Sequence, residues 1–398
     1  MTRDRPFFFR RPVIDYPDEV AVMDFNQYFK SRQGEMVNVL KQVVAHESPS
    51  SDKKAVDACS AFVTGEFRKA GAKITRVPQK TTGDFQIVEF PGPAKAAGEG
   101  QILVLTHIDT VWPVGKLGSM PFYISGNKIF GPGVLDMKSG IVTSLFALKA
   151  IHQLRLSASR KVVLFINSSE EIGSPAADEL IGQLARKSRT VLCLEPALPG
   201  GALKTQRKGR LVLRLEVKGR AAHAGSPEKG VNAVEELIGQ LRRLKRLETG
   251  GLTLSVNQIG GGQKVNVIAE EAWALMDVRF WTVRQRDRLQ SVIKESEPLK
   301  SGAKLKFSVE GRTPPMEKTQ ASAKLFQQAK AIASTLEINL SEGKAGGGSD
   351  ASIASSFGVP TLDGLGPDGD GMHAAHEHVL LPSFVQRAAL LTELLRQL

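Results

Sequence analysis

Hydrophobic residues follow two alternating patterns along most of the chain. Short, continuous apolar runs are typical of strands buried on both faces of a sheet, and they occur at 101–106, 161–166 and 190–194. Apolar residues spaced three to four positions apart predict helices at 25–46, 54–70, 139–154 and 176–186. This alternation favours an α/β fold in which a mostly parallel sheet carries helices on both faces.

The pattern changes near Arg210. Strands are predicted at 211–217, 250–259, 270–280 and 304–309, with helices at 231–247 and 285–297. The order βαββαβ is that of a ferredoxin-like unit. Helical spacing then resumes at 321–334 and 383–398, with a short strand at 361–362. We therefore expect an α/β domain made of residues 1–207 and 314–398, which begins with a proline-punctuated arm at 1–25 and is interrupted by an inserted sheet domain at 208–313.

Composition and charge exclude several classes of protein. The 398 residues are 41% hydrophobic and 24% charged, as in ordinary globular proteins. The net charge is +12, yet no nucleic-acid module accompanies the basic clusters at 207–210, 242–246 and 284–288. We expect these clusters to be mainly solvated surface and predict no nucleic-acid partner. A basic environment for an anionic substrate stays open.

The chain lacks the signals of secretion and of membrane insertion. It has no apolar run near the ~18 residues of a membrane span, and its first residues lack the apolar stretch of a signal peptide. Two cysteines, Cys59 and Cys193, cannot build a disulfide scaffold and are expected to be buried thiols. We expect a cytoplasmic protein that contacts no membrane.

Acidic and histidine residues stand at the ends of the predicted strands. They are His107, Asp109, Glu170, Glu171 and Glu195, and Asp136 lies in a glycine-rich turn that opens a helix. Each alone has an ordinary alternative, such as a strand-end cap or a helix-start charge. Ligands of parallel sheets bind at the carboxyl ends of the strands, so these side chains should converge. Clustered carboxylates need compensating cations, and mixed histidine and carboxylate ligands suit zinc. The excess of carboxylates suits a pair of metal ions.

The motifs resemble those of the di-zinc metallopeptidases that include glutamate carboxypeptidase, aminoacylase and succinyl-diaminopimelate desuccinylase. The resemblance covers residues 37–398 and is closest to the bacterial glutamate carboxypeptidases. It rests on His107-x-Asp109, Gly131-Pro-Gly-x-x-Asp136, Glu170-Glu171-x-Gly173, Glu195-Pro196, Gly219-x-x-x-His223-Ala-Gly225, Asn266-Val-Ile268, Asp277-Val-Arg279, Gly346-Gly-Gly-Ser-Asp350 and Gly371-Met-His373-x-x-x-Glu377. It implies a zinc-peptidase type of α/β domain with an inserted domain at 208–313.

The resemblance also implies a site with two Zn²⁺ ions per chain, for which Co²⁺ or Mn²⁺ are substitutes. Asp136 would bridge the ions and precede a cis peptide bond. His107 and Glu195 would complete one set of ligands, and Glu171 and His373 the other, with His376 as the alternative to His373. A third nearby histidine, His378, is expected at the surface. Asp109 would fix the tautomer of His107, and Glu170 would be the general base.

Further residues are implied for substrate binding. His223 would donate a hydrogen bond to the oxyanion, in many relatives across a dimer, and Asn266 would add a polar contact. Arg279 is the best candidate to hold a substrate carboxylate. Arg312 and Lys204 are weaker candidates, for which surface ion pairs are an equal alternative. Gly347 and Gly348 would direct backbone N–H groups at the substrate.

The expected activity is hydrolysis of an amide bond that releases a C-terminal amino acid, such as glutamate. The substrate is a small peptide or an N-acyl amino acid with a free carboxylate. An aminoacylase or a dipeptidase with another side-chain preference is the alternative. A non-catalytic paralogue is disfavoured, because all five ligand positions and the base carry competent residues. A homodimer through residues 208–313 is also expected.

Overall fold

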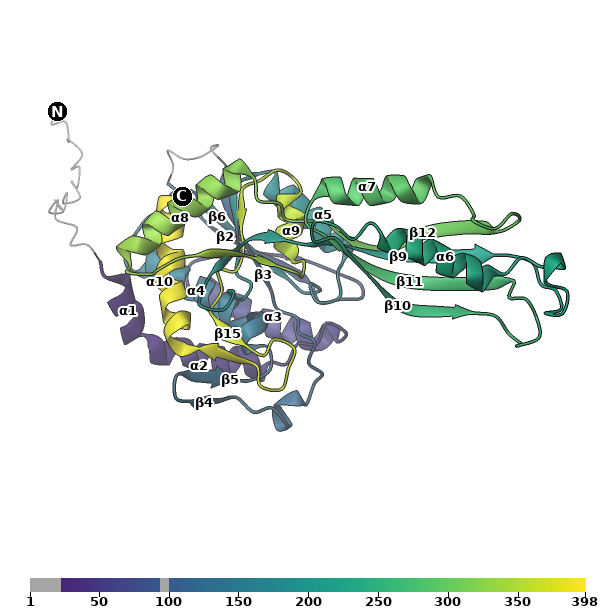
Figure 1. The fold of residues 1–398 in the computed structure, drawn as a ribbon. Coiled ribbons are helices and arrows are strands. Elements are labelled where there is room, and N and C mark those ends of the chain that lie inside the picture. Colours follow the sequence, from purple (N-terminus) through teal and green to yellow (C-terminus); the bar gives the residue numbers. More distant parts are fainter. Residues whose placement is uncertain (1–22, 94–99) are drawn as a thin grey trace, which may run out of the picture.

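The computed structural model describes residues 23–93 and 100–398, so nearly all of the predicted arm lies outside the described residues. Figure 1 shows a larger α/β part and a smaller, elongated part that extends to one side of it. Among the described residues, no helix is long and apolar enough to cross a membrane. Cys59 and Cys193 are both free and buried, as expected.

The main sheet has six strands in the order β1-β2-β6-β3-β7-β14. Their bounds are Lys73–Val77, Phe85–Phe90, Lys161–Asn167, Gln101–His107, Ser188–Cys193 and Thr361–Leu362. Strands β6, β3, β7 and β14 run parallel, whereas β1 and β2 form an antiparallel edge. The predicted α/β class with a mostly parallel sheet is confirmed.

Successive side chains of the central strands point to opposite faces, and each face is covered by helices. Ile102 and Val104 face the larger core, whereas Leu103 and Leu105 face the smaller one. The helices on the larger core are α1 (Phe25–Ser31), α2 (Gln33–Ala45), α3 (Lys53–Lys69), α4 (Ser139–Gln153), α8 (Gln320–Thr335) and α10 (Leu381–Gln397). The smaller core is closed by α5 (Pro175–Ala185) and α9 (Asp350–Ser355). Both faces are therefore buried, as the continuous apolar runs predicted.

One predicted helix is wrong in its continuity. The span 25–46 divides into α1 and α2 at Arg32, whose ψ of 5° departs from the helical value. The break lets Phe25 and Phe29 of α1 pack in the core near α10, while α2 packs against α4 and the turn that carries Asp136. Apolar spacing continued across the break, so periodicity alone did not reveal it.

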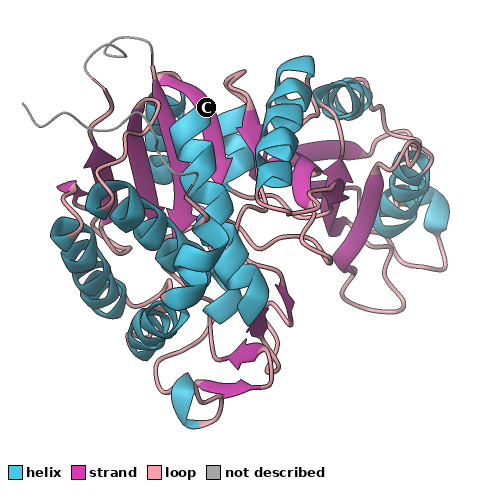
Figure 2. Cartoon of the chain, turned by 90° about the vertical axis from the view of Figure 1, so that its left-hand side faces the viewer, coloured by secondary structure: helices cyan, strands magenta, loops and turns pink. Residues whose placement is uncertain are grey.

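The elongated part is a four-stranded antiparallel sheet in the order β10-β11-β9-β12, here called the inserted sheet (Figures 1 and 2). Its elements follow the predicted βαββαβ order: β9 (Gly209–Lys218), α6 (Ala233–Lys245), β10 (Thr253–Gly261), β11 (Glu271–Phe280), α7 (Val283–Lys294) and β12 (Lys304–Thr313). Helices α6 and α7 cover one face and share a core of their own with it.

Short strands complete the surroundings of the strand ends. A second antiparallel sheet joins β15 (Gly369–Asp370), β16 (His378–Leu380), β5 (Lys128–Phe130) and β4 (Tyr123–Ser125). A parallel pair joins β13 (Glu342–Ala345) to β8 (Leu203–Arg207), which leads directly into β9. The periodicity did not predict these strands, because most are too short to show it.

Candidate metal centre

Five predicted ligands meet at the carboxyl edge of the main sheet. Nε2 of His107 lies 3.0 Å from Oδ1 of Asp136 and 3.6 Å from Oε1 of Glu195. On the other side of Asp136, its Oδ2 lies 3.2 Å from Nε2 of His373, which is 3.3 Å from Oε2 of Glu171. Asp136 thus presents one oxygen to each histidine. We call these five residues the candidate metal cluster.

The elements that carry the cluster explain its assembly. His107 ends β3, and Glu195 lies just beyond the neighbouring strand β7. Asp136 lies in the turn before α4, where the Asp136–Met137 peptide bond is cis, as expected. His373 lies in the turn before β16 and has a φ of 60°, a backbone conformation that is uncommon for residues other than glycine. Turns distant in sequence therefore meet at one sheet edge.

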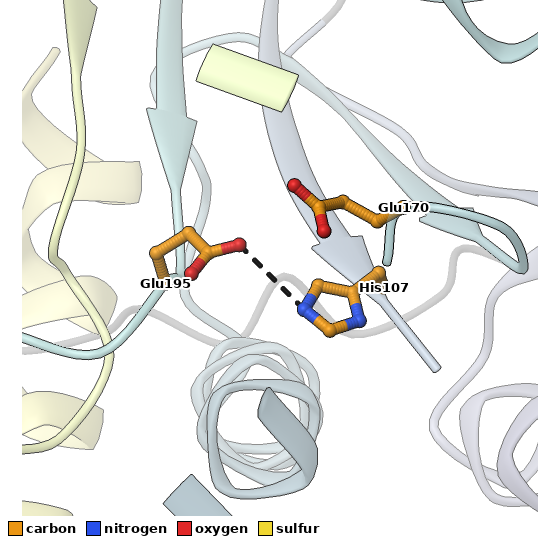
Figure 3. A group of neighbouring side chains, drawn as sticks. All are labelled: His107, Glu170 and Glu195. Atoms are coloured by element: carbon orange, nitrogen blue, oxygen red, sulfur yellow. Dashed lines mark ion pairs between the residues drawn. The ribbon is translucent and has the colours of Figure 1, made fainter. Parts of the chain in front are cut away.

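Glu170 lies beside the cluster without belonging to its chain of close contacts. Potential ligand atoms of His107, Glu170 and Glu195 all lie within 4.8 Å of one another, and Figure 3 shows both carboxylates turned toward the His107 ring. Burial raises the pKa of the Glu170 carboxyl well above its usual value, and the charge of Glu195 adds to this rise. An unliganded carboxylate with a raised pKa is suited to exchange a proton.

The electrostatics of the cluster favour positive charge between its carboxylates. The pKa of His373 is raised to about 10 because its ring contacts Asp136 and Glu171. Burial raises the pKa of Glu195 to about 7, and the charge of Asp136 contributes. Burial opposes ionisation of Asp136 too, but hydrogen bonds from both histidines hold its pKa below the usual value.

The donor atoms fit a pair of divalent cations. Two imidazoles and three carboxylates are the ligand types that zinc and similar metal ions take. Oε1 of Glu171 is buried and has no hydrogen-bond partner within the described residues. Such an unpaired buried oxygen is costly unless a cation or another donor satisfies it.

Asp109 has a wider role than the predicted contact with His107. The shorter contact of His107 Nδ1 is to the backbone oxygen of Asp109, at 3.0 Å, and the carboxylate Oδ1 lies 3.5 Å away. The same carboxylate accepts hydrogen bonds from the N–H groups of Glu170 and Glu171 and from the hydroxyl of Ser50, at 3.2, 3.3 and 2.6 Å. Asp109 therefore holds the turn that carries both glutamates. Ser50 gave no sequence signal, because it lies 59 residues from Asp109.

A cavity of about 880 Å³ opens from the cluster toward the inserted sheet. Glu170, Glu171 and His373 line its inner part. Its other walls come from the segment 172–178, from 348–353 and from the near end of the inserted sheet. Apolar side chains among these are Ile172, Val309 and Ile353. The cavity joins the two parts of the molecule.

The arginines that line the cavity differ in their partners. Arg279 is already engaged, because its Nε and Nη2 lie 2.6 and 3.3 Å from the carboxylate of Asp277 and its Nη1 donates to Gly346 O at 3.4 Å. Arg210, which the sequence reasoning did not select, also pairs with Asp277, at 2.6 Å. Arg312 is exposed and forms no ion pair within the described residues. The charge of Arg312 acts on Asp178, which lines the same cavity, but no close ion pair in the described part of the chain holds its guanidinium group, so Arg312 can receive a carboxylate in this conformation.

The turn that contains Gly347 and Gly348 borders the cavity, and Arg207 holds it through hydrogen bonds to its carbonyl groups. The carbonyl oxygens of Gly347 and Gly348 accept hydrogen bonds from Nη1 of buried Arg207, at 3.0 and 3.2 Å. Arg207 also pairs with Asp363 and lies 3.8 Å from Oε2 of Glu195. Within the described residues, the N–H groups of both glycines donate no hydrogen bond. They remain available to a ligand.

Three further predictions meet the structure differently. Lys204 is buried on β8 and does not line the cavity; its charge instead interacts with those of Asp363 and Glu195. His376 is exposed and lies outside the cluster, which contains His373. The expectation that His378 is a surface residue is wrong. It is only 6% exposed, its Nδ1 lies 2.9 Å from the carbonyl oxygen of His376, which accepts the hydrogen bond, and its ring lies against Phe130.

His223 and Asn266 are far from the cluster of their own chain. They lie together beyond the distal end of β9, where Ala224 N donates to Asn266 O at 3.0 Å. Strand β9 extends from Gly209 to Lys218, which corresponds to roughly 30 Å at about 3.3 Å per residue. Both residues are exposed, and neither lines the cavity.

The fold and the cluster define a class of protein, the metal-dependent hydrolases with a paired-cation site. Comparison with known proteins agrees. The model of peptidase family M20/M25/M40 matches residues 103–397. The chain therefore belongs to this peptidase family, whose members include metallo-carboxypeptidases.

Individual relatives are distant in sequence but similar over most of their length. The chain is 28% identical to carboxypeptidase G2 of Pseudomonas sp. (strain RS-16) over 377 residues, which is 92% of this chain and 90% of the relative. It superposes on the aminopeptidase PepT of Bacillus cereus with a TM-score of 0.75 at 19% identity, covering 92% of this chain and 98% of PepT. The YXEP protein of Bacillus subtilis, described as a dinuclear metal-binding peptidase of family M20, gives 0.68 at 15% identity, with 92% and 98% covered.

Proposed function

We propose that the protein is a zinc-dependent hydrolase that releases a C-terminal amino acid from a small peptide or an N-acyl amino acid. The observation that supports this most is the position of Glu170 beside five clustered ligand residues, at the inner end of a cavity with a free arginine. The likeness to carboxypeptidase G2 over 92% of the chain supports a carboxypeptidase rather than an aminopeptidase.

We assign two Zn²⁺ ions to the cluster, with Asp136 shared between them. His107 and Glu195 would hold one ion, and Glu171 and His373 would hold the other, because these two pairs lie on opposite sides of Asp136. When bound, such ions lower the pKa of a coordinated water and polarise the scissile carbonyl group. Co²⁺ and Mn²⁺ suit the same oxygen and nitrogen donors.

The residues of the chain supply the proton transfers. Glu170 accepts a proton from the water that attacks the carbonyl carbon, and it then delivers this proton to the leaving amine nitrogen. Its raised pKa brings it closer to neutrality, where a carboxyl group both accepts and returns a proton. Asp109 keeps Glu170 in place through the backbone N–H group.

Substrate recognition is assigned to the cavity wall. Arg312 pairs with the free carboxylate of the substrate, and Arg279 contributes only if Asp277 releases it. The N–H groups of Gly347 and Gly348 hydrogen-bond the substrate backbone. The apolar group formed by Ile172, Val309 and Ile353 receives the acyl side. Lys204 acts on the carboxylates electrostatically rather than by contact.

A second copy of the chain completes the site. Residues 208–313 form the dimerisation domain, and β10 is the edge strand that pairs, because its nine residues carry no charge. The opposite edge, β12, carries Lys304, Lys306, Glu310 and Arg312, and charged edges resist pairing. The partner's inserted sheet then brings His223 and Asn266 to this chain's cavity, where His223 donates to the oxyanion.

A cytoplasmic location remains an expectation from cysteine usage.

A substrate panel tests the activity. Purified protein loaded with Zn²⁺ is assayed against N-acyl amino acids and dipeptides, with free and amidated C-termini. We expect turnover of the free acids and at least ~10-fold lower kcat/KM for the amides, because the latter lack the carboxylate that pairs with arginine. Equal rates on both series contradict carboxylate recognition and favour another dipeptidase or aminoacylase specificity. No turnover of any member contradicts the proposal.

A further inference from the structure

Glu377 is a buried carboxylate on which several parts of the metal centre converge. Glu377 is 1% exposed and lies four positions after His373 in the sequence. Oε2 accepts hydrogen bonds from Gly133 N and from the indole Nε1 of Trp112, both at 2.9 Å. Oε1 accepts from Leu135 N at 2.9 Å and from Asp136 N at 3.1 Å. Four donors therefore engage both oxygens, so Glu377 is not itself available as a ligand.

These donors come from segments that carry the candidate ligands. Trp112 lies in the segment that leaves β3 after His107, and the three backbone donors form the turn that ends in Asp136. Glu377 itself closes the turn of His373, since its N–H donates to Ala374 O at 3.0 Å. Glu377 thus links the segment after His107, the turn of Asp136 and the turn of His373.

We propose that Glu377 is a positioning residue that fixes the arrangement of the ligands for both cations. The inference rests on the proposed metal centre, but it concerns how the chain holds its ligands rather than which bond is hydrolysed. The backbone N–H groups of Gly133, Leu135 and Asp136 all point toward the carboxylate of Glu377. Only a side chain that accepts hydrogen bonds can pair with them at this buried position. A cluster held in this way is organised before a cation arrives, which increases affinity.

The substitution Glu377→Gln tests this without changing the size of the side chain. The amide replaces one acceptor oxygen with an NH₂ group, which faces N–H donors and leaves them unpaired. Glu236 on α6 offers a matched control. It is 0% exposed and accepts from Leu299 N, Lys300 N and Gln240 Nε2, yet it lies in the inserted sheet domain, away from the cluster. Glu236→Gln therefore makes the same chemical change elsewhere.

Zinc binding to metal-free protein is measured by competition with a chromophoric chelator, and the Tm of each metal-free variant is measured alongside. We expect Glu377→Gln to bind both zinc ions at least about 10-fold more weakly, whereas Glu236→Gln binds them as the wild type does. Both variants should show a lower Tm. Wild-type zinc affinity in a folded Glu377→Gln protein overturns the proposal, as does an equal loss in the control.

Trp112→Phe provides a second variant if Glu377→Gln does not fold. It keeps an aromatic side chain but replaces the indole by a smaller ring that lacks the N–H donor, so zinc binding should weaken by a smaller factor in the same direction. Unchanged affinity in this variant then overturns the proposal. Failure of the wild type to hydrolyse the substrate panel refutes the proposed function but leaves this zinc measurement valid, so the two failures are distinguishable.

Discussion

The carboxyl edge of the main sheet and the distal tip of the inserted sheet hold residues assigned to one reaction, but they are built differently. At the edge, side chains from five segments contact one another, and most are buried. At the tip, His223 and Asn266 are exposed, and among the described residues the ring of His223 accepts only from Gly225 N, at 3.0 Å. Folding of one chain assembles the candidate metal cluster, whereas in the proposed reaction the tip would act on the cavity of a second chain.

Under the proposed function, this difference separates the residues that one chain can hold in place from those that a second chain would supply. Ligand residues must be held rigidly, because a pair of cations demands fixed distances, and a single core supplies that rigidity. An oxyanion donor is needed only when substrate is bound. It can therefore be supplied by a surface that arrives from a second chain.

Removal of Asp136 should have the largest effect on the edge. Asp136→Ala removes the side chain that contacts both His107 and His373. The remaining carboxylates, Glu171 and Glu195, then lack the shared ligand that links the two halves of the candidate metal cluster. We expect loss of both bound metals and of all measurable turnover, because the chemistry depends on them. Elemental analysis of purified protein checks this. A variant that still holds two zinc ions per chain refutes the shared role.

Glu170→Gln should separate chemistry from metal binding at the same edge. We expect kcat to fall at least ~10²-fold while zinc content stays at the wild-type level, because Glu170 acts as a base and not as a ligand. Glu179→Gln, an exposed glutamate on α5, is the control and should leave both quantities unchanged. Parallel loss of zinc and activity in Glu170→Gln would make it a ligand instead.

Mixing two inactive variants tests whether the tip acts on a second chain. Glu170→Ala and His223→Ala chains are each expected to be inactive as homodimers. Refolded together, they should recover part of the activity, because one site of the heterodimer combines an intact base with an intact histidine. Mass spectrometry establishes the heterodimer. If a proven heterodimer shows no recovery, His223 acts within its own chain or not at all.

The smallest expected effect concerns stability, and it compares a buried carboxylate of the larger α/β part, Asp84, with an exposed one of the inserted sheet, Glu216. Buried Asp84, in the larger α/β part, has its pKa lowered despite burial, through hydrogen bonds from Lys53, Gln79 N and Arg76. Its ionised form therefore stabilises the fold above the usual value of 3.8, and this is lost as the pH falls through the folded pKa. Asp84→Asn should lower the free energy of unfolding by about 2 kcal/mol at neutral pH.

Thermal unfolding across a pH series checks this contrast. The difference between wild type and Asp84→Asn should narrow as the pH falls below about 4, because the carboxyl group of the unfolded chain is protonated there first, and it should be lost as the pH falls through the lower folded pKa. Glu216, on the open face of the inserted sheet, pairs with Lys306 and Arg214 at the surface. Glu216→Gln should leave Tm unchanged, because exposed ion pairs contribute little. An equal decrease in Tm in Asp84→Asn and Glu216→Gln would contradict the expected difference between buried and exposed carboxylates.

The partners of Arg279 show what local pattern could have revealed. Asp277 and Arg279 are two positions apart on β11, and side chains two apart on a strand share a face. Their ion pair could have been predicted from this spacing. The engagement of Arg279 with Gly346 could not, since it joins segments 67 residues apart.

The strand-end positions of His107, Glu170, Glu171 and Glu195 could be read from the sequence, because apolar runs mark strands locally and parallel strands end at one edge. The βαββαβ order was readable for the same reason. The partners of Glu377 could not be predicted in this way. Trp112 is 265 residues away and Gly133 is 244 away, and nothing in either local pattern indicates a shared carboxylate.

By itself, the sequence determined the order of helices and strands and the chemistry at the strand ends. Both depend on the spacing of side chains a few residues apart, which backbone geometry converts directly into faces and ends. Only the tertiary structure decided that Asp136 lies between both histidines, that Arg279 is held by Asp277 whereas Arg312 forms no close ion pair among the described residues, and that His223 lies beyond the end of β9 that is remote from the cavity. These relations depend on how distant segments pack, and packing is settled by the whole core at once.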